Sequence, residues 1–402
     1  LNTMTGATRA DGAIDIDGGI GTMLVIAGKG RREMPDGPVY VDGGGEALSR
    51  GGSFVGQHIA VPLQGVAVHI NAFNFPVWGM LEKLAPTLLA GMPAIVKPAT
   101  QTCYLTEACF RMIVESGLVP PGAVQLVVGG VGDMLERLGA QDVVSFTGSA
   151  QTALKLRATP ALMHNSVRFH AEQDSLNATV LGPDVIAGSA AFDAFIREAA
   201  NEITTKAGQK CTAIRRIIVP KNAVTEVADA LVDRLKGVTI GDPAADGVTM
   251  GALASAAQKS DVLATIAKLS DEAKCLTGDP EDVDTVGAGQ NGAFLAPTLL
   301  CCDAPDDAQN VHQLEAFGPV STIMPYRDLE HASALANRGG GSLVASLVTD
   351  DPQVARSFTL ASAAWHGRLY INGTKSMKEA TGHGAPLPHM VHGGPGRAGG
   401  GE

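Results

Sequence analysis

The stretch GVAVHINAFNFPVWGMLEKLAPTLLAGMPAIVKPAT, residues 65–100, decides the fold. A short apolar run at 65–70 is followed by an amphipathic segment at 77–91 and by a second apolar run at 94–97. Two short apolar runs joined by a helix of this length form a right-handed crossover between parallel strands. The stretch therefore predicts a βαβ unit, the building block of a doubly wound α/β sheet.

The same alternation continues along the rest of the chain. We expect further helices at 101–117 and 132–140 and further strands at 124–129 and 143–146. Beyond residue 177 the pattern predicts a second α/β unit, with strands at 178–181, 213–219, 321–325 and 342–348 and helices at 191–206, 223–236 and 257–269. Alternating apolar residues without helical periodicity at 38–63 predict a β-hairpin.

The carboxyl ends of the first strands are the expected ligand-binding edge, because doubly wound sheets bind ligands there. These ends carry Asn71 to Asn74, Lys97-Pro98, Gly129-Gly130 and Thr147-Gly148-Ser149. The last of these opens an amphipathic helix at 150–157, whose first N–H groups could meet a pyrophosphate. Gly129-Gly130 lacks a full glycine fingerprint, and a turn is its favoured interpretation.

The composition of the 402-residue chain excludes several classes of protein. A net charge of −11 without any long Lys/Arg block argues against a nucleic-acid partner. No apolar stretch is long enough to cross a membrane, and the first residues do not form a signal peptide, so a cytoplasmic protein is predicted. The six cysteines form no C-x-x-C pair and no metal-ligand spacing with histidine, which predicts neither disulfides nor a metal site. Because the chain starts at Leu1 and stops in a glycine run, we expect a fragment of a longer protein.

Cys211 is the strongest candidate nucleophile. It follows the helix expected at 191–206 and therefore lies in a loop, where reactive groups are often placed on a rigid scaffold. A thiol attacks as thiolate, and a nearby dipole or base can produce that form. The plainer interpretation is a small buried hydrophobic residue. Spacing alone leaves both interpretations open.

Several motifs in one order resemble the aldehyde dehydrogenase superfamily. They comprise Phe73-Asn74-Phe75-Pro76, Val96-Lys97-Pro98, Phe146-Thr147-Gly148-Ser149, Glu172 in its polar loop, Gly208-Gln209-Lys210-Cys211 and Glu315-Ala316-Phe317-Gly318-Pro319. The resemblance implies an α/β fold in which a doubly wound nucleotide-binding domain accompanies an α/β catalytic domain and an oligomerisation hairpin. The implied domains are 1–35 with 65–174 for the cofactor, 36–64 for the hairpin, and 175–402 for catalysis and the start of a tail.

Departures from the common family pattern narrow the resemblance. Most members carry Glu-Leu-Gly-Gly-Lys around the general base, whereas this chain has Glu172-Gln173-Asp174-Ser175-Leu176-Asn177. This variant, together with the tail from His392 to Gly401, resembles the dehydrogenase halves of the bifunctional ring-opening enzymes of phenylacetate catabolism and the semialdehyde dehydrogenases of benzoyl-CoA oxidation. The resemblance implies a semialdehyde carried on coenzyme A as substrate, assembly into a homo-oligomer, and fusion to a hydratase domain beyond Glu402.

The resemblance also implies a role for each site residue. Cys211 is the nucleophile, Glu172 the general base for thioester hydrolysis, and Asn74 an oxyanion donor together with the Cys211 N–H. The implied cofactor contacts are Lys97, Thr100, Phe146, Thr147, Gly148, Ser149, Glu315 and Phe317. Taken singly, Glu172 could be a surface carboxylate, Asn74 a turn residue, Lys97 a solvated lysine and Glu315 an exposed helix-edge residue.

Thr100 predicts the cofactor. NAD-selective members usually carry an acidic residue three positions after the lysine, where it binds both ribose hydroxyls. Thr100 occupies that position and removes the repulsion of a 2′-phosphate. We therefore expect NADP to be preferred, with NAD use also open. Two alternatives remain: a CoA-acylating dehydrogenase, which often lacks the general base, and a non-catalytic fragment that keeps the fold.

Overall fold

The computed structural model describes residues 2–289 and 292–400, and the chain forms two compact units. Unit 1 comprises Leu1–Ile14, Gly148–Ala150 and Ala171–Glu402, and unit 2 comprises Asp15–Thr147 and Gln151–His170. The assignment of the sequence-predicted domains to cofactor binding, oligomerisation and catalysis stays a prediction. Gly401, the last residue of the tail motif, lies outside the described residues, as does the Leu1 terminus.

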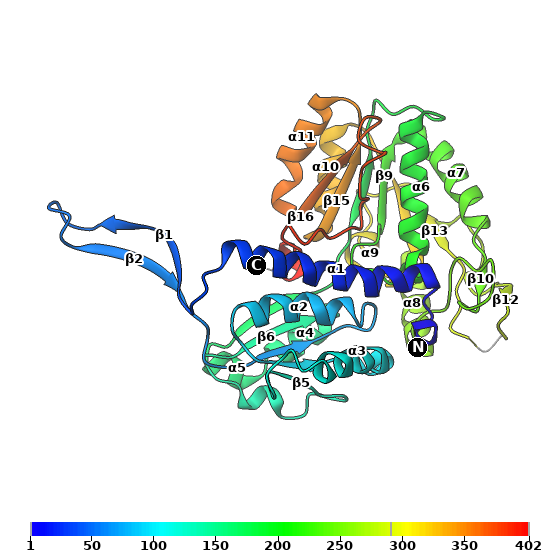
Figure 1. The fold of residues 1–402 in the computed structure, drawn as a ribbon. Helices are drawn as coiled ribbons and strands as arrows, with labels where there is room; N and C mark the ends of the chain where they lie inside the picture. Colours follow the sequence, from blue (N-terminus) through cyan, green and yellow to red (C-terminus); the bar gives the residue numbers. More distant parts are fainter. Residues whose placement is uncertain (1, 290–291, 401–402) are drawn as a thin grey trace. The chain divides into compact units, whose positions relative to one another are not determined.

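A five-stranded sheet forms the centre of unit 2 (Figure 1). Its order is β5-β4-β3-β6-β7. The strands are β3 (Ala67–Ile70), β4 (Ala94–Lys97), β5 (Val124–Leu126), β6 (Val143–Thr147) and β7 (Arg168–Glu172). Strand β3 pairs in parallel with β4 and with β6, and β4 pairs in parallel with β5. The order reverses between β3 and β6, which confirms the doubly wound arrangement.

Helices connect these strands where the apolar periodicity predicts them. They are α2 (Trp78–Leu89), α3 (Cys103–Glu115), α4 (Ala150–Arg157), α5 (Pro160–His164) and the longer α1 (Arg9–Glu33). The apolar face of α2 packs with β4 and α3, and Ile16 and Met23 of α1 contact the same cluster. The helix expected at 132–140 is wrong, because only the 3-10 turn η3 (Met134–Arg137) forms there. Gly132 has a positive φ of 54° and Leu138 is extended, so the backbone on either side of the turn leaves the helical region.

The predicted hairpin is confirmed. Strand β1 (Tyr40–Ala47) pairs antiparallel with β2 (Val55–Ala60), and a register shift separates its two halves. Every residue of β1 is exposed, and within unit 2 the hairpin extends away from the sheet (Figure 1). Large apolar side chains are exposed on it or beside it, among them Val41, Phe54 and Ile59.

A seven-stranded sheet forms the centre of unit 1. Its order is β11-β13-β14-β9-β8-β15-β16. The strands are β8 (Ala178–Leu181), β9 (Arg216–Pro220), β11 (Lys274–Cys275), β13 (Thr298–Cys301), β14 (Val320–Tyr326), β15 (Ser342–Val348) and β16 (His366–Asn372). The pairs between neighbours are parallel except for β11 with β13. A separate small ladder joins β10 (Ile240–Gly241) to β12 (Thr285–Val286).

Both faces of this sheet are buried under helices. Ile217 and Val219 of β9 point into one core with α6 (Ala190–Thr204) and α7 (Val224–Lys236), whereas Ile218 points into the other. That second core also receives side chains from α8 (Ala256–Leu269), α9 (Asn310–Gln313), α10 (Leu329–Asn337) and α11 (Pro352–Ser362). The sequence of a strand that is buried on both faces is a nearly continuous apolar run, as in β9 and β15.

The loops that carry three of the sequence-predicted site residues lie at the amino ends of strands in unit 1. Glu172 precedes β8, Cys211 precedes β9 and Glu315 precedes β14. Because these strands are parallel neighbours, their amino ends meet at one edge of the sheet. The rule that ligands bind at the carboxyl ends of the strands, which was used for the first sheet, therefore does not predict where these loops of the second sheet lie. Among the described residues, no helix combines the length and apolar character that crossing a bilayer requires.

Candidate active site

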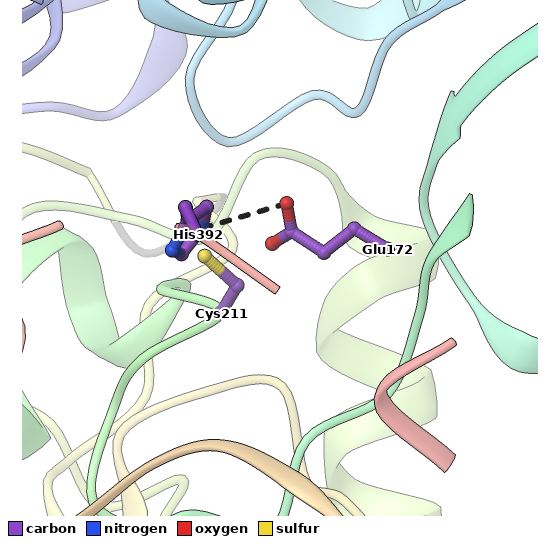
Figure 2. Close-up of side chains that lie close together, drawn as sticks. All are labelled: Glu172, Cys211 and His392. Carbon is purple, nitrogen blue, oxygen red and sulfur yellow. Dashed lines mark ion pairs between the residues drawn. The ribbon is translucent and has the colours of Figure 1, made fainter. Parts of the chain in front are cut away.

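Three reactive side chains of unit 1 come together: Cys211, Glu172 and His392. The thiol sulfur, a carboxylate oxygen and an imidazole nitrogen lie within 4.8 Å of one another. His392 Nε2 is 3.5 Å from Glu172 Oε2. Figure 2 shows the carboxylate directed at the imidazole, with the Cys211 sulfur beside the ring. The His392 and Glu172 side chains keep 19% and 14% of their surface exposed, so a small molecule can reach the cluster.

A strained turn carries Cys211. The 3-10 segment η4 (Thr205–Gly208) follows α6, and Lys206, Ala207 and Gly208 have φ values of 53°, 52° and 69°. Positive φ is costly for residues with a Cβ and persists where surrounding contacts enforce it, often at functional sites. Gly208 meets a second requirement, because a Cβ there would collide with the Gly318 carbonyl. The chain therefore reverses sharply after α6 and presents Cys211 at the edge of the sheet.

Arg215 holds this turn in place. Its guanidinium donates to the Gly318 and Gly208 carbonyls at 2.8 Å each and to the Lys210 carbonyl at 3.3 Å. Its Nε lies 3.3 Å from Glu315 Oε1. A buried arginine is stable only when its donors are paired, and here most partners are loop carbonyls. Arg215 thus ties the Cys211 turn to the loop before β14.

Asn177 also holds the Cys211 loop, through hydrogen bonds to its backbone carbonyls. Its Nδ2 donates to the Cys211 carbonyl at 2.8 Å and to the Ala213 carbonyl at 3.0 Å. Its Oδ1 accepts from Ser175 Oγ at 2.6 Å and from Val344 N at 3.1 Å. The side chain is fully buried. One amide therefore connects the loop that carries Glu172, the loop that carries Cys211 and strand β15.

Replacing Asn177 with aspartate should destabilise unit 1. The substitution puts an acceptor oxygen where a donor now faces two carbonyls, which leaves buried polar atoms unsatisfied. We expect the free energy of unfolding to fall by about 2 kcal/mol, measured by urea denaturation. Asn201→Asp on the exposed face of α6 is the matched control and should stay close to the original stability. Equal stability of the two variants would contradict the bridging role of Asn177.

The end of β7 and the glycine-rich tail place Glu172 and His392. The Glu172 carbonyl accepts from Gly148 N at 3.1 Å, and Gln173 N donates to the Ala398 carbonyl at 3.1 Å. Gly399 has a φ of 101°, and a Cβ there would collide with the Ala171 carbonyl. The tail therefore lies against the strand end that carries Glu172. Sequence reasoning assigned His392 no role, because only its place in the tail motif drew attention to it.

Two arginines interact electrostatically with Cys211. Burial lowers the pKa of Arg368, and the neighbouring Cys211 and Glu202 charges act to raise it. Cys211 also acts to raise the pKa of Arg215. Lys210 forms an ion pair with Glu202 at 2.8 Å, so its charge is balanced by that carboxylate. Cations close to a thiol favour its thiolate form. The thiol, carboxylate and imidazole of the cluster are also groups that can bind a metal cation.

The sequence-predicted residues of unit 2 lie at the carboxyl ends of its strands. Asn74 is buried after β3, in a loop held by Thr102 Oγ1, which donates to the Phe73 carbonyl at 3.0 Å. Lys97 ends β4, its Nζ donates to the Pro98 carbonyl at 3.1 Å, and burial lowers its pKa. Thr100 is exposed at the start of η2 (Thr100–Thr102).

Two further predicted residues end β6. Phe146 is buried and stacks on Phe169, with ring centroids 6.5 Å apart. Thr147 Oγ1 accepts from Lys83 Nζ at 2.8 Å. The cofactor roles of these residues, and the oxyanion role of Asn74, stay predictions.

The remaining predicted residues belong to unit 1. Gly148 and the exposed Ser149 precede α4, whose first amide, Ala150 N, donates to Asp174 Oδ1 at 2.9 Å. Glu315 is not an exposed helix-edge residue, because only 7% of its side chain is exposed and it accepts from Ser175 N at 3.1 Å. Burial raises the pKa of the Glu315 carboxyl to about 7, although Arg215 acts to lower it. Phe317 lies under the Arg215 guanidinium at 5.4 Å.

Comparison with known sequences adds an independent finding. Residues 2–386 match the model of the aldehyde dehydrogenase family. The chain is 44% identical over 392 residues to 3,4-dehydroadipyl-CoA semialdehyde dehydrogenase from Aromatoleum evansii, covering 97% of this chain and 76% of that protein. It is 51% identical over 154 residues to Protein MaoC from Klebsiella aerogenes, covering 38% of this chain and 44% of that protein.

Comparison with solved structures supports the fold. Succinic semialdehyde dehydrogenase from Streptococcus pyogenes, solved with NADP+, matches with a TM-score of 0.82 at 21% identity, covering 99% of this chain and 80% of that one. Betaine aldehyde dehydrogenase from Staphylococcus aureus, solved with NAD+, matches with a TM-score of 0.81 at 23% identity, covering 98% and 72%. At this identity the likeness establishes the shared architecture.

Proposed function

The chain belongs to the aldehyde dehydrogenase family, and we propose that it oxidises a CoA-linked semialdehyde to its carboxylate through a thioester on Cys211. The observation that carries the proposal is the approach of the Cys211 sulfur and the Glu172 carboxylate within 4.8 Å. This proximity places a candidate nucleophile and a candidate base at one site, as thioester formation and hydrolysis require.

Cys211 performs the first half of the reaction. Its thiolate adds to the aldehyde carbon, and the carbonyl π pair moves to the oxygen. The Cys211 N–H and the Asn74 side-chain amide are the proposed donors to that oxyanion. A nicotinamide, when bound, would supply the acceptor for the hydride of this carbon. The carbonyl then re-forms as an acyl thioester on the Cys211 sulfur.

Glu172 performs the second half. Its carboxylate takes a proton from water, and the resulting hydroxide oxygen bonds to the thioester carbon. Collapse of the tetrahedral species breaks the carbon–sulfur bond and returns the electron pair to Cys211. The product is a carboxylic acid, which ionises at neutral pH. The retained Glu172 favours hydrolysis over transfer to free coenzyme A.

The residues of unit 2 fit a dinucleotide cofactor. The strand order reverses between β3 and β6, which is where doubly wound sheets bind dinucleotides. Lys97 at the end of β4 and the exposed Thr100 offer an amine and a hydroxyl to ribose and phosphate oxygens. These side chains would hold the adenosine end, and the absence of a carboxylate at position 100 supports NADP as the preferred form.

The substrate and the assembly are proposed on separate grounds. The name of the Aromatoleum evansii relative supports a CoA-linked semialdehyde. Incubation with 3,4-dehydroadipyl-CoA semialdehyde, with and without free coenzyme A, tests this: a carboxylate in both cases supports hydrolysis, and a new thioester only with coenzyme A supports the acylating alternative. The exposed strands of the β1–β2 hairpin favour pairing with another copy of the chain. Fusion to a hydratase domain stays a prediction.

Replacing Thr100 with glutamate should reverse the cofactor preference. A carboxylate at this position repels the 2′-phosphate of NADP, so we expect kcat/KM for NADP to fall about tenfold, equivalent to about 1.4 kcal/mol. The value for NAD should change much less. Thr100→Gln, of similar size and without charge, is the control for steric effects. A marked preference of the unmodified protein for NAD would defeat this part of the proposal.

A further inference from the structure

We infer that His392 accepts the proton of the Cys211 thiol and thereby keeps the nucleophile as a thiolate paired with an imidazolium. The inference rests on the proposed nucleophilic role of Cys211 and adds a residue to it. Its basis is the three-way approach of sulfur, imidazole and carboxylate within 4.8 Å. Imidazole is the side chain best suited to exchange protons near neutral pH.

Contacts of the tail hold His392 close to Glu172 and Cys211. After His392 the tail is joined to the loop before β15 by Arg397 N, which donates to the Gly340 carbonyl at 3.0 Å, and within the tail Gly400 N donates to the Gly394 carbonyl at 2.8 Å. Gln173 N, next to Glu172, donates to the Ala398 carbonyl at 3.1 Å. The Arg397 guanidinium also lies 3.6 Å from Asp174 Oδ2. The segment that carries His392 is therefore tied to the loop that carries Glu172.

Among the charged groups near the thiol, some stabilise a thiolate and others can also accept the thiol proton. Arg215 and Arg368 interact electrostatically with Cys211, and both stabilise a thiolate without accepting its proton. Glu172 is the carboxylate that faces the imidazole, at 3.5 Å, and favours its charged form. Lys210 is paired with Glu202 and adds little. Among these groups, His392 and Glu172 can take a proton, and the imidazole can do so while leaving the carboxylate ionised for water.

The proton balance follows from this arrangement. The S–H bond of Cys211 breaks, its electron pair stays on sulfur and the proton binds an imidazole nitrogen of His392. After thioester hydrolysis the leaving sulfur regains its electron pair, so the thiolate–imidazolium pair is restored. The proton of the attacking water goes to Glu172 and then to solvent. No further oxidant or reductant is needed.

The test is the pH dependence of Cys211 alkylation by iodoacetamide, without aldehyde or cofactor and with a chelator present. Peptide mass spectrometry separates Cys211 from the other five cysteines, and Cys211→Ala gives the blank. His392→Phe keeps a planar ring but removes the proton acceptor. His392→Gln is a second variant of smaller volume, and His389→Phe, on the exposed part of the same segment, is the matched control.

For the unmodified chain we expect half-maximal alkylation below pH 7, against about 8.5 for the pKa of an ordinary thiol. In both His392 variants the half-point should rise by at least about one pH unit, so that alkylation at pH 6.5 slows about tenfold. His389→Phe should leave the profile unchanged. An unchanged profile in either folded His392 variant overturns the inference. Since the assay needs no turnover, failure of the proposed dehydrogenase function would appear separately, as absence of cofactor reduction.

Discussion

Replacing Cys211 with alanine should abolish aldehyde oxidation, with kcat/KM falling at least about 10⁴-fold. Without the sulfur no covalent adduct forms, and the hydride has no tetrahedral alkoxide to leave from. Arg215 and Asn177 hold the surrounding loop through backbone carbonyls, so the loop should keep its shape when the thiol is lost. Stopped-flow measurement of cofactor reduction with an aldehyde would show neither a burst nor a steady state.

Cys275→Ala is the matched control for this experiment. Cys275 belongs to β11 of the same unit and is partly exposed. It is not one of the three clustered residues, and its sulfur donates to the Gly278 carbonyl. The variant should keep the activity of the unmodified chain. Residual activity of Cys211→Ala within tenfold of the control would show that another group attacks the aldehyde.

Replacing Glu172 with glutamine should separate the two halves of the reaction. The first half does not need the carboxylate as base for water, so a burst of about one reduced cofactor per site should survive. Steady-state turnover should fall about 10³-fold, because a positioned general base typically contributes 10²- to 10⁴-fold. Glu226→Gln, on the exposed face of α7, should change neither phase.

Loss of the burst together with turnover in Glu172→Gln would mean that the carboxylate is needed before hydride transfer. Full turnover without any loss would mean that water is activated by another group, and His392 would then be the nearest candidate. Either result would change the proposed roles of Glu172 as the base for water and of His392 as the proton acceptor of the thiol.

The buried strands could be read from the sequence because their periodicity is simple. The runs at 94–97, 178–181 and 342–348 coincide with β4, β8 and β15, and every residue of β8 and β15 is buried. The helix at 132–140 was predicted wrongly because apolar spacing carries no information on the positive φ of Gly132. Helix α1 was not predicted, although Thr8 and Asp11 form reciprocal side-chain hydrogen bonds at its start, a capping signal that the sequence does contain.

The site was predicted in part. Cys211 and Glu172 were found through ordered motifs, and the structure brings them together. His392 lies far along the chain, and its approach depends on a tail whose path is fixed by backbone hydrogen bonds. Arg215 and Asn177 act through carbonyls of neighbouring loops, which no spacing rule can reveal.

The most direct test of the thioester account is peptide mass spectrometry of Glu172→Gln, quenched shortly after mixing with NADP and the CoA-linked semialdehyde. In this variant the acyl group should accumulate because its hydrolysis is slow. The account predicts that the peptide containing Cys211 gains the mass of the acyl group, in proportion to the cofactor reduced. An unmodified Cys211 peptide, with reduction proceeding or with no reduction by any aldehyde, would contradict it.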